Sequence, residues 1–205
     1  MNPTPEKTSV MAPFILMLFL YFIVGLFTVI NQQFQVPLKS ALLPHDGNMT
    51  NALVTLLNFS WFLAYPFSEG FATRWVDRLG YRKTSVYSLL IFIAGLGFYE
   101  AAVLLHIYAP SYITIMGNPI FTGFFIFLSG SFVIGMAVTI LQVVTGLYLD
   151  VNPVGKTTPL QRQMIGGTTN SIGMAIGPLV VSYIIFYGIP LHNVQSREFI
   201  WPVIC

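Results

Sequence analysis

Long apolar stretches alternate with short polar ones along this chain. An apolar run of about 20 residues is long enough to cross the hydrocarbon core of a bilayer as a helix. Runs of this kind predict about five transmembrane helices, at residues 12–37, 49–73, 84–105, 120–149 and 165–189. Residues 1–11 and 190–205 flank them as polar tails. We therefore predict an all-α membrane protein whose helical bundle occupies residues 12–189.

Composition supports this prediction. Of the 205 residues, 55% are hydrophobic and only 8% are charged, and the mean hydropathy is +0.75. A soluble domain carries roughly 25% charged residues, which makes a water-soluble fold implausible. The first run is long, rich in aromatic residues and lacks a small-residue cleavage site, so we interpret it as a retained helix and not as a signal peptide.

The positions of the basic residues predict the orientation. The net charge of +2 says little, but with the amino end inside, seven of the nine bases fall on the cytoplasmic side: Lys7, Arg74, Arg78, Arg82, Lys83, Lys156 and Arg162. Cytoplasmic loops carry an excess of Lys and Arg. We therefore expect a multi-pass protein of the cytoplasmic membrane, with tail 1–11 in the cytoplasm and tail 190–205 outside.

Residues 74–83 are the one dense cluster of charge. Five of the ten are ionisable, namely Arg74, Asp77, Arg78, Arg82 and Lys83. An apolar run stands on each side, so the cluster predicts a short solvated loop in which Gly80 permits a tight reversal. Glu69, just before it, is expected to pair with a loop base such as Arg74. The cluster is too small to indicate nucleic-acid binding.

Amides within the first helix are candidates for binding a polar solute. Asn31, Gln32 and Gln33 lie near its outer end. An amide in hydrocarbon is costly unless it is paired, so these side chains should face protein or a watery cavity. A polar helix end at the membrane interface is the alternative, because Lys39 follows closely.

The later helices carry four more candidate residues. Asn58, Trp61 and Tyr65 form one stripe at helical spacing. Such a pairing can bind a sugar, because the amide forms hydrogen bonds with its hydroxyl groups and the indole ring stacks on its flat apolar face. Structural packing would explain Trp61 equally well. Gln142 lies deep in the fourth helix, and Asn170 lies near the small-residue face of the fifth.

That face is formed by Gly173 and Gly177, whose spacing of four suits close packing on a neighbouring helix. Pro178 follows and permits a bend. Glu100, the one carboxylate inside an apolar run, is interpreted as a helix-end group, with a proton-linked role as the alternative.

These motifs resemble a known transporter superfamily. Arg74-Trp-Val-Asp-Arg-Leu-Gly-Tyr-Arg-Lys83 is similar to the loop signature of the major facilitator superfamily, although Thr73 replaces its usual glycine. Gly173 to Pro178 resembles its glycine-proline motif. The amides before Pro37, the Leu141-Gln142 pair and Thr169-Asn-Ser-Ile-Gly173 resemble the fucose/glucose/galactose branch, the bacterial sugar–proton symporters. The resemblance covers about residues 14–187.

The resemblance implies that this chain forms most of the amino-terminal half-bundle of a twelve-helix sugar transporter that works by alternating access. Gln33 and Gln142 stand where the fucose symporter pattern has acidic residues. Neither can titrate, so the resemblance implies sugar hydrogen bonding there and leaves coupling to a proton or other cation open. It implies that Asp77 and the neighbouring bases latch the two halves. The implied partners are the bilayer, a sugar and the missing second half, with no cofactor and no metal.

Three alternatives remain at this point. The chain could be a truncated fragment that transports nothing, because it ends before a sixth helix. Two copies could associate to complete a transporter. An intramembrane enzyme is a remote alternative, since His45, His106 and His192 fall in outer segments without an accompanying acid pair.

Overall fold

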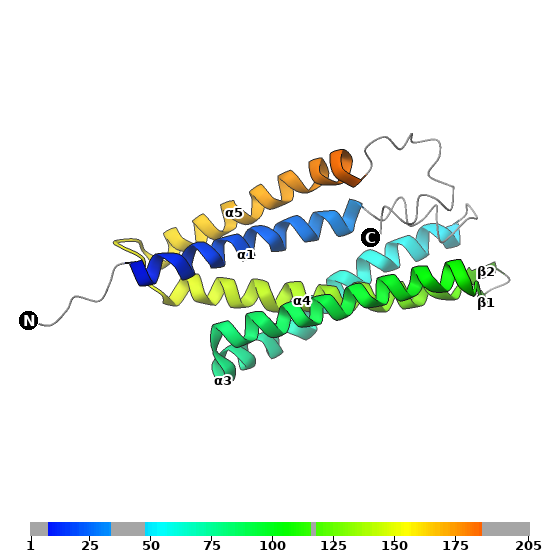
Figure 1. Cartoon of the computed structure of the whole chain (residues 1–205), viewed down its shortest axis with the longest axis horizontal. Helices are drawn as coiled ribbons and strands as arrows, with labels where there is room; N and C mark the ends of the chain where they lie inside the picture. Colours follow the sequence, from blue (N-terminus) through cyan, green and yellow to red (C-terminus); the bar gives the residue numbers. More distant parts are fainter. Residues whose placement is uncertain (1–7, 34–47, 116–117, 186–205) are drawn as a thin grey trace, which may run out of the picture.

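The chain folds into an elongated helical bundle (Figure 1). The computed structural model describes residues 8–33, 48–115 and 118–185. The elements in chain order are α1 (Thr8–Gln33), α3 (Asn48–Tyr108), β1 (Tyr112–Ile115), β2 (Asn118–Phe121), α4 (Thr122–Val151), α5 (Pro159–Val180) and the π-helix η1 (Val181–Ile185). Within the described residues, four helices are long and apolar enough to cross a membrane.

Helix α3 contains both the second and the third predicted helices. It doubles back on itself (Figure 1), and Gly80 is its one residue with non-helical backbone angles, φ 78° and ψ 167°. That region is essentially restricted to glycine. The chain therefore reverses at Gly80 as predicted. The prediction of a loop over all of residues 74–83 is wrong, because only Gly80 departs from helical geometry. The charged residues on both sides of Gly80 continue the helices, because helical backbone pairs its own polar groups whatever the side chains are.

The other helix bounds also differ from those predicted. Helix α1 begins at Thr8, which shortens the expected tail 1–11, while residues 34–37 lie outside the described residues. Helix α5 begins at Pro159, not at residue 165. Thr158 Oγ1 accepts a hydrogen bond from the Gln161 N–H, and Gln161 Oε1 accepts one from the Thr158 N–H, which together form a capping box. Residues 186–189 and the tail 190–205 lie outside the described residues.

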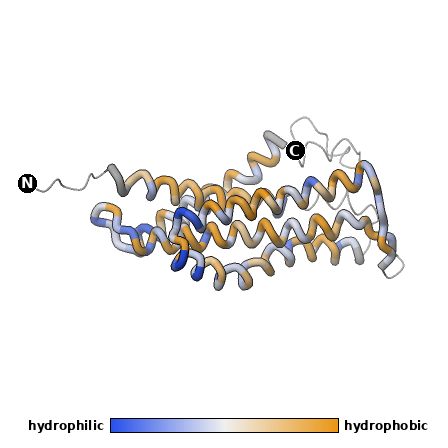
Figure 2. The backbone as a smooth tube through the Cα atoms, turned by 60° about the horizontal axis from the view of Figure 1, so that its bottom comes forward, coloured by the Kyte–Doolittle hydropathy of each residue, from blue (hydrophilic) through white to orange (hydrophobic). Residues whose placement is uncertain are grey.

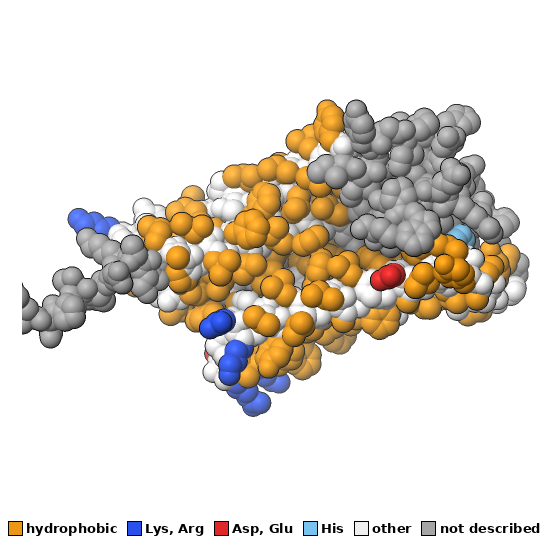
Figure 3. Space-filling model, in the orientation of Figure 1, with side chains coloured by type: hydrophobic (Ala, Val, Ile, Leu, Met, Phe, Trp, Pro, Cys, Tyr) orange, Lys and Arg blue, Asp and Glu red, His pale blue; other side chains and the backbone are white. Residues whose placement is uncertain are grey.

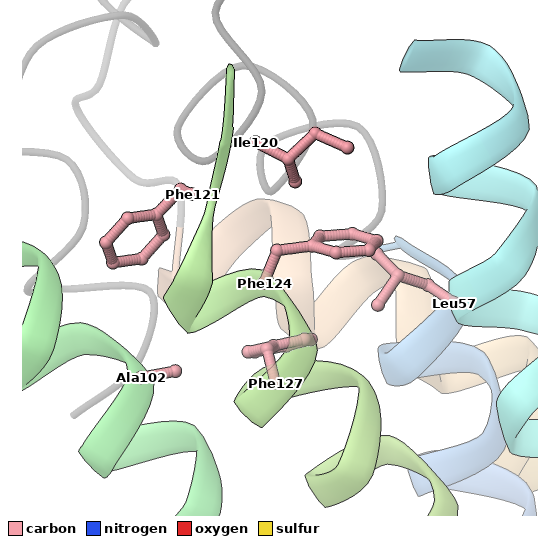
Figure 4. Close-up of a cluster of buried hydrophobic side chains, with 6 residues drawn as sticks. All are labelled: Leu57, Ala102, Ile120, Phe121, Phe124 and Phe127. Carbon is pink, nitrogen blue, oxygen red and sulfur yellow. The ribbon is translucent and has the colours of Figure 1, made fainter. Parts of the chain in front are cut away.

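A short antiparallel hairpin, absent from the sequence prediction, connects α3 to α4. Strands β1 and β2 pair in a register that sets Tyr112 opposite Phe121 and Ile115 opposite Asn118. The hairpin anchors one end of the bundle, because two side chains of β2 join a buried cluster with both arms of α3 and the start of α4 (Figure 4). The cluster is Leu57, Ala102, Ile120, Phe121, Phe124 and Phe127.

Helix α4 lies at the centre of the packing. It buries residues along its whole length, and Phe124 and Val144 are fully buried. A second cluster joins α4 to both α1 and α3 through Val24, Trp61, Ile134, Val138 and Leu141. Helix α5 packs mainly along α1. The bundle is therefore built from two helix pairs, α3 with α4 and α1 with α5, that meet at α4.

The outer surface is largely apolar. Large hydrophobic side chains are exposed on both arms of α3, among them Phe59 at 58% and Ile93 at 63%. Hydrophobic side chains cover most of the described part of the face shown in Figure 3, and in Figure 2 the middle of the bundle is hydrophobic while hydrophilic residues gather at one end. Apolar surface of this extent marks contact with lipid or protein. Together with the helix lengths, it indicates a membrane protein.

Candidate functional site

Asn31 takes part in a polar chain that crosses the bundle. Its Nδ2 donates to the Tyr99 hydroxyl at 3.1 Å, and that hydroxyl lies 2.8 Å from Ser131 Oγ. The Tyr99 ring stacks on Phe127 with ring centroids 3.9 Å apart. Three hydrogen-bonding groups from α1, α3 and α4 are therefore held together at a half-buried position.

The remaining candidate amides differ in burial. Gln32 and Gln33 are exposed at the last residues of α1, whereas Asn58 on α3 and Gln142 on α4 are half-buried. The Gln142 side chain makes no hydrogen bond within the described part of the chain. These amides do not converge on one enclosed pocket.

Trp61 does not lie where the sugar-binding hypothesis requires. Its side chain is 1% exposed and packs between α1 and α4. Its Nε1 makes no hydrogen bond within the described ranges; the Tyr65 hydroxyl interacts with the indole, but the geometry falls short of a hydrogen bond. An indole buried in this way cannot stack on a solute, so the packing alternative describes Trp61 in this structure.

Asn170 is also engaged in packing. Its Nδ2 donates to the backbone carbonyl of Tyr21 at 2.9 Å. A Cβ atom on Gly25 would lie 2.1 Å from the backbone oxygen of Asn170, so the two helices approach closely at this point. Asn170 therefore joins α5 to α1.

The small-residue face of α5 lies against α1. A Cβ atom on Gly173 would lie 2.2 Å from the Phe22 carbonyl oxygen, and one on Gly177 would lie 3.2 Å from Val29. Pro178 lies inside α5, and beyond it the helix changes to the π-helix η1. The Val181 N–H donates to the carbonyls of both Gly177 and Pro178, so hydrogen bonding continues past the proline.

The charged turn of α3 is exposed. Arg74, Asp77, Arg78, Arg82 and Lys83 are all exposed, and basic side chains stand out at this end of the bundle in Figure 3. Over residues 8–33, 48–115 and 118–185, no ion pair joins these groups to one another or to Glu69. The expected pair between Glu69 and Arg74 is therefore absent, because residues five apart do not share a helix face.

Comparisons with protein-family models, with curated proteins and with solved structures found no match to this chain. The residues themselves must therefore carry any functional argument.

A small, partly open cavity lies between α1, the second arm of α3, and α4. Its lining is Ile23, Val24, Phe27, Ser88, Leu89, Phe92, Ala137, Val138 and Leu141. None of the predicted solute-binding amides is among these residues. In the described ranges, no three histidine, cysteine or acidic side chains gather closely enough to hold a metal ion.

Sequence reasoning missed the structural importance of Arg162. Its side chain is 3% exposed, and its guanidinium donates to the carbonyls of Leu149, Asp150 and Thr157 at 2.6–2.7 Å. A cation is favourable at the carbonyl end of a helix, because the macrodipole is negative there. Gln163 Nε2 adds a 2.7 Å hydrogen bond to Gly146 O. The signal in the sequence is a base that follows shortly after the end of a helix.

Proposed function

We propose that this chain forms the amino-terminal part of a membrane transporter of the major facilitator type, and that its solute is a sugar. One observation carries the proposal. The turn at Gly80 displays Asp77, Arg78 and Arg82 in exposed positions, and none of them forms an ion pair in the described part of the chain. In the superfamily that the sequence resembles, these groups latch two halves together, which is the role we propose for them here.

The proposed solute is a sugar because the half-buried amides on the helices are neutral hydrogen-bonding groups. Asn31, Asn58 and Gln142 are half-buried on three helices. Amides of this kind suit a ligand with many hydroxyl groups. Gln32 and Gln33 extend the proposed surface at the end of α1. Trp61 and Asn170 are excluded from it because of their packing roles.

The proposed orientation follows from the charges. The start of α1, the turn of α3 and the connection between α4 and α5 lie at the same end of the bundle (Figure 1). The bases of the turn, with Lys156 and Arg162, are therefore on one side. We assign that side to the cytoplasm by the excess of positive charge.

Binding and transport of labelled sugars test the proposal. The chain would be reconstituted into liposomes together with the second half-bundle that the proposal requires, and L-fucose, D-glucose and D-galactose would be compared for uptake and, with the chain in detergent, for equilibrium binding. Asp77→Asn should lower uptake and leave binding nearly unchanged, because the turn is far from the solute. Asp150→Asn, at another exposed carboxylate, is the matched control. Equal loss of binding and uptake in Asp77→Asn would remove the latch assignment.

Gln142 provides the test of the solute itself. Gln142→Leu should weaken binding of the preferred sugar roughly ten-fold, the cost of about one well-formed hydrogen bond in a binding site. Ser129→Ala, at an exposed position on the same helix, should leave binding unchanged. A folded protein that binds none of the three sugars would refute the sugar assignment.

A further inference from the structure

The charged turn of α3 carries an excess of positive charge. Arg74, Arg78, Arg82 and Lys83 are exposed, and Asp77 is the one acidic residue among them. Four bases less one carboxylate leave a net charge of +3 on residues 74–83. No ion pair neutralises these bases in the part of the chain that the structure describes, so their charge is available to a partner.

Aromatic residues place this turn at the level of a membrane surface. Trp75 packs edge-on against Tyr87 across the turn, with ring centroids 6.2 Å apart. Tyr81 packs at 90° against Tyr148 of α4, at 5.4 Å. Trp and Tyr are enriched where hydrocarbon meets the headgroups, because each combines an apolar ring with a polar tip.

An apolar surface continues from the turn along the second arm of α3. Val86, Leu90 and Ile93 are exposed at 50%, 55% and 63%. A ligand that binds the bases and extends along this arm would contact charged side chains at one end and apolar side chains along the rest of its length. That order matches a phospholipid, with a phosphate in the headgroup and acyl chains beneath it.

We propose that the turn of α3 is a binding site for the headgroups of anionic phospholipids. Arg and Lys side chains bind phosphate oxygens by charge-assisted hydrogen bonds, and basic clusters at the end of a membrane helix attract anionic lipids. The inference requires that α3 be embedded in a membrane. It does not require that the protein transports a sugar, so either proposal can fail without the other.

Native mass spectrometry of the full chain tests this site. The protein in detergent would be titrated with equal amounts of phosphatidylglycerol and phosphatidylcholine, and the bound lipids counted. Wild type should prefer phosphatidylglycerol, and the preference should fall as salt is added. Each base changed to Gln should reduce the preference by up to about five-fold, and the four-base variant should abolish it.

Two matched variants separate this site from a general effect of charge. Lys156→Gln removes one exposed base from the α4–α5 connection at the same end of the bundle, and it should leave the preference unchanged. Asp77→Asn removes the one opposing charge of the turn and should raise the preference. Circular dichroism would establish that every variant keeps its helices.

Three outcomes would overturn the proposal. One is an unchanged preference in the folded four-base variant. Another is an equal loss of preference in Lys156→Gln and in Arg82→Gln. The third is displacement of phosphatidylglycerol by inorganic phosphate at the same concentration, because the site would then bind free oxyanions without any contribution from acyl chains.

Discussion

The pair α1–α5 and the pair α3–α4 are joined in different ways. Helix α4 buries fifteen residues, including large side chains such as Phe124 and Phe127. Helix α5 buries four, of which three are the glycines Gly166, Gly173 and Gly177. The α3–α4 joint is therefore filled mainly with side chains, although Gly135 of α4 comes close to the Trp61 carbonyl, whereas the α1–α5 joint brings backbone close to backbone at Gly25 and Gly173.

This difference determines how each joint can fail. A joint filled with side chains is sensitive to lost volume, because a cavity forfeits packing contacts. A joint of glycines against backbone is sensitive to added atoms, because the helices must move apart to accommodate them. Free energies of unfolding, measured by titrating the protein with SDS in mixed micelles and following circular dichroism, can test this contrast.

Phe124→Ala should give the largest effect. The Phe124 side chain is 0% exposed at the start of α4, where this helix packs on α3. Its removal should lower the free energy of unfolding by about 3–5 kcal/mol. Phe59→Ala, at a ring that is 58% exposed, should cost much less. Similar costs at the two positions would mean that the α3–α4 joint is not filled as described.

Arg162→Leu tests the link between the two helix pairs. It should lower the free energy of unfolding by about 3 kcal/mol, because the carbonyls of Leu149, Asp150 and Thr157 lose their hydrogen-bond donor. Arg162→Lys keeps the charge but cannot reach all three carbonyls, so its loss should be intermediate. Lys156→Gln at the same connection should stay within about 0.5 kcal/mol of wild type. A neutral result for Arg162→Leu would show that α4 and α5 are held together without it.

Gly173→Ala should destabilise the α1–α5 joint by about 2 kcal/mol. The added Cβ would lie 2.2 Å from the Phe22 carbonyl oxygen, which belongs to backbone and cannot rotate away. Gly167→Ala on the same helix meets nothing within 4 Å and should instead stabilise by up to about 1 kcal/mol through helix propensity. Stabilisation by both substitutions would contradict the close approach of α1 and α5.

Tyr99→Phe should have the smallest effect, about 0.5–1 kcal/mol, which is typical of a hydrogen bond inside a membrane protein. It removes the hydroxyl that joins Asn31 of α1 to Ser131 of α4 and leaves the ring stacked on Phe127. Tyr87→Phe, at a residue that is 45% exposed, is the control. A loss as large as that of Phe124→Ala would mean that polar groups, and not packing, hold the two pairs together.

The helices could be predicted from the sequence because long apolar runs leave few alternatives in a membrane. Gly80 could also be identified as the point of reversal. Its flanks were assigned to a loop because they are charged, yet charge does not stop a helix. The early start of α5 had a readable signal in Thr158 and Gln161, the two ends of a capping box. The hairpin β1–β2 has no such signal in the sequence, since strands of four residues are too short to show a clear alternation of apolar and polar residues.

The orientation of individual side chains could not be predicted. A helix that is apolar all round has no amphipathic face to show which side meets protein and which meets lipid. The spacing of Trp61 along its helix and the position of Asn170 near a glycine face therefore predict a solute surface, although both side chains face neighbouring helices. The same uncertainty applies to Asn58 and Gln142, whose half-buried positions became known only from the packing of α3 and α4.

The single-residue turn at Gly80 also bears on how the protein responds to bilayer thickness. The two arms of α3 have no spare chain between them, so neither can slide along the membrane normal without the other. Sliding would also carry Arg78 and Arg82 into hydrocarbon, which is costly for a charged group. Thinner or thicker bilayers should therefore be accommodated by a common tilt of both arms. The depth of α3 in the membrane is set at its charged end.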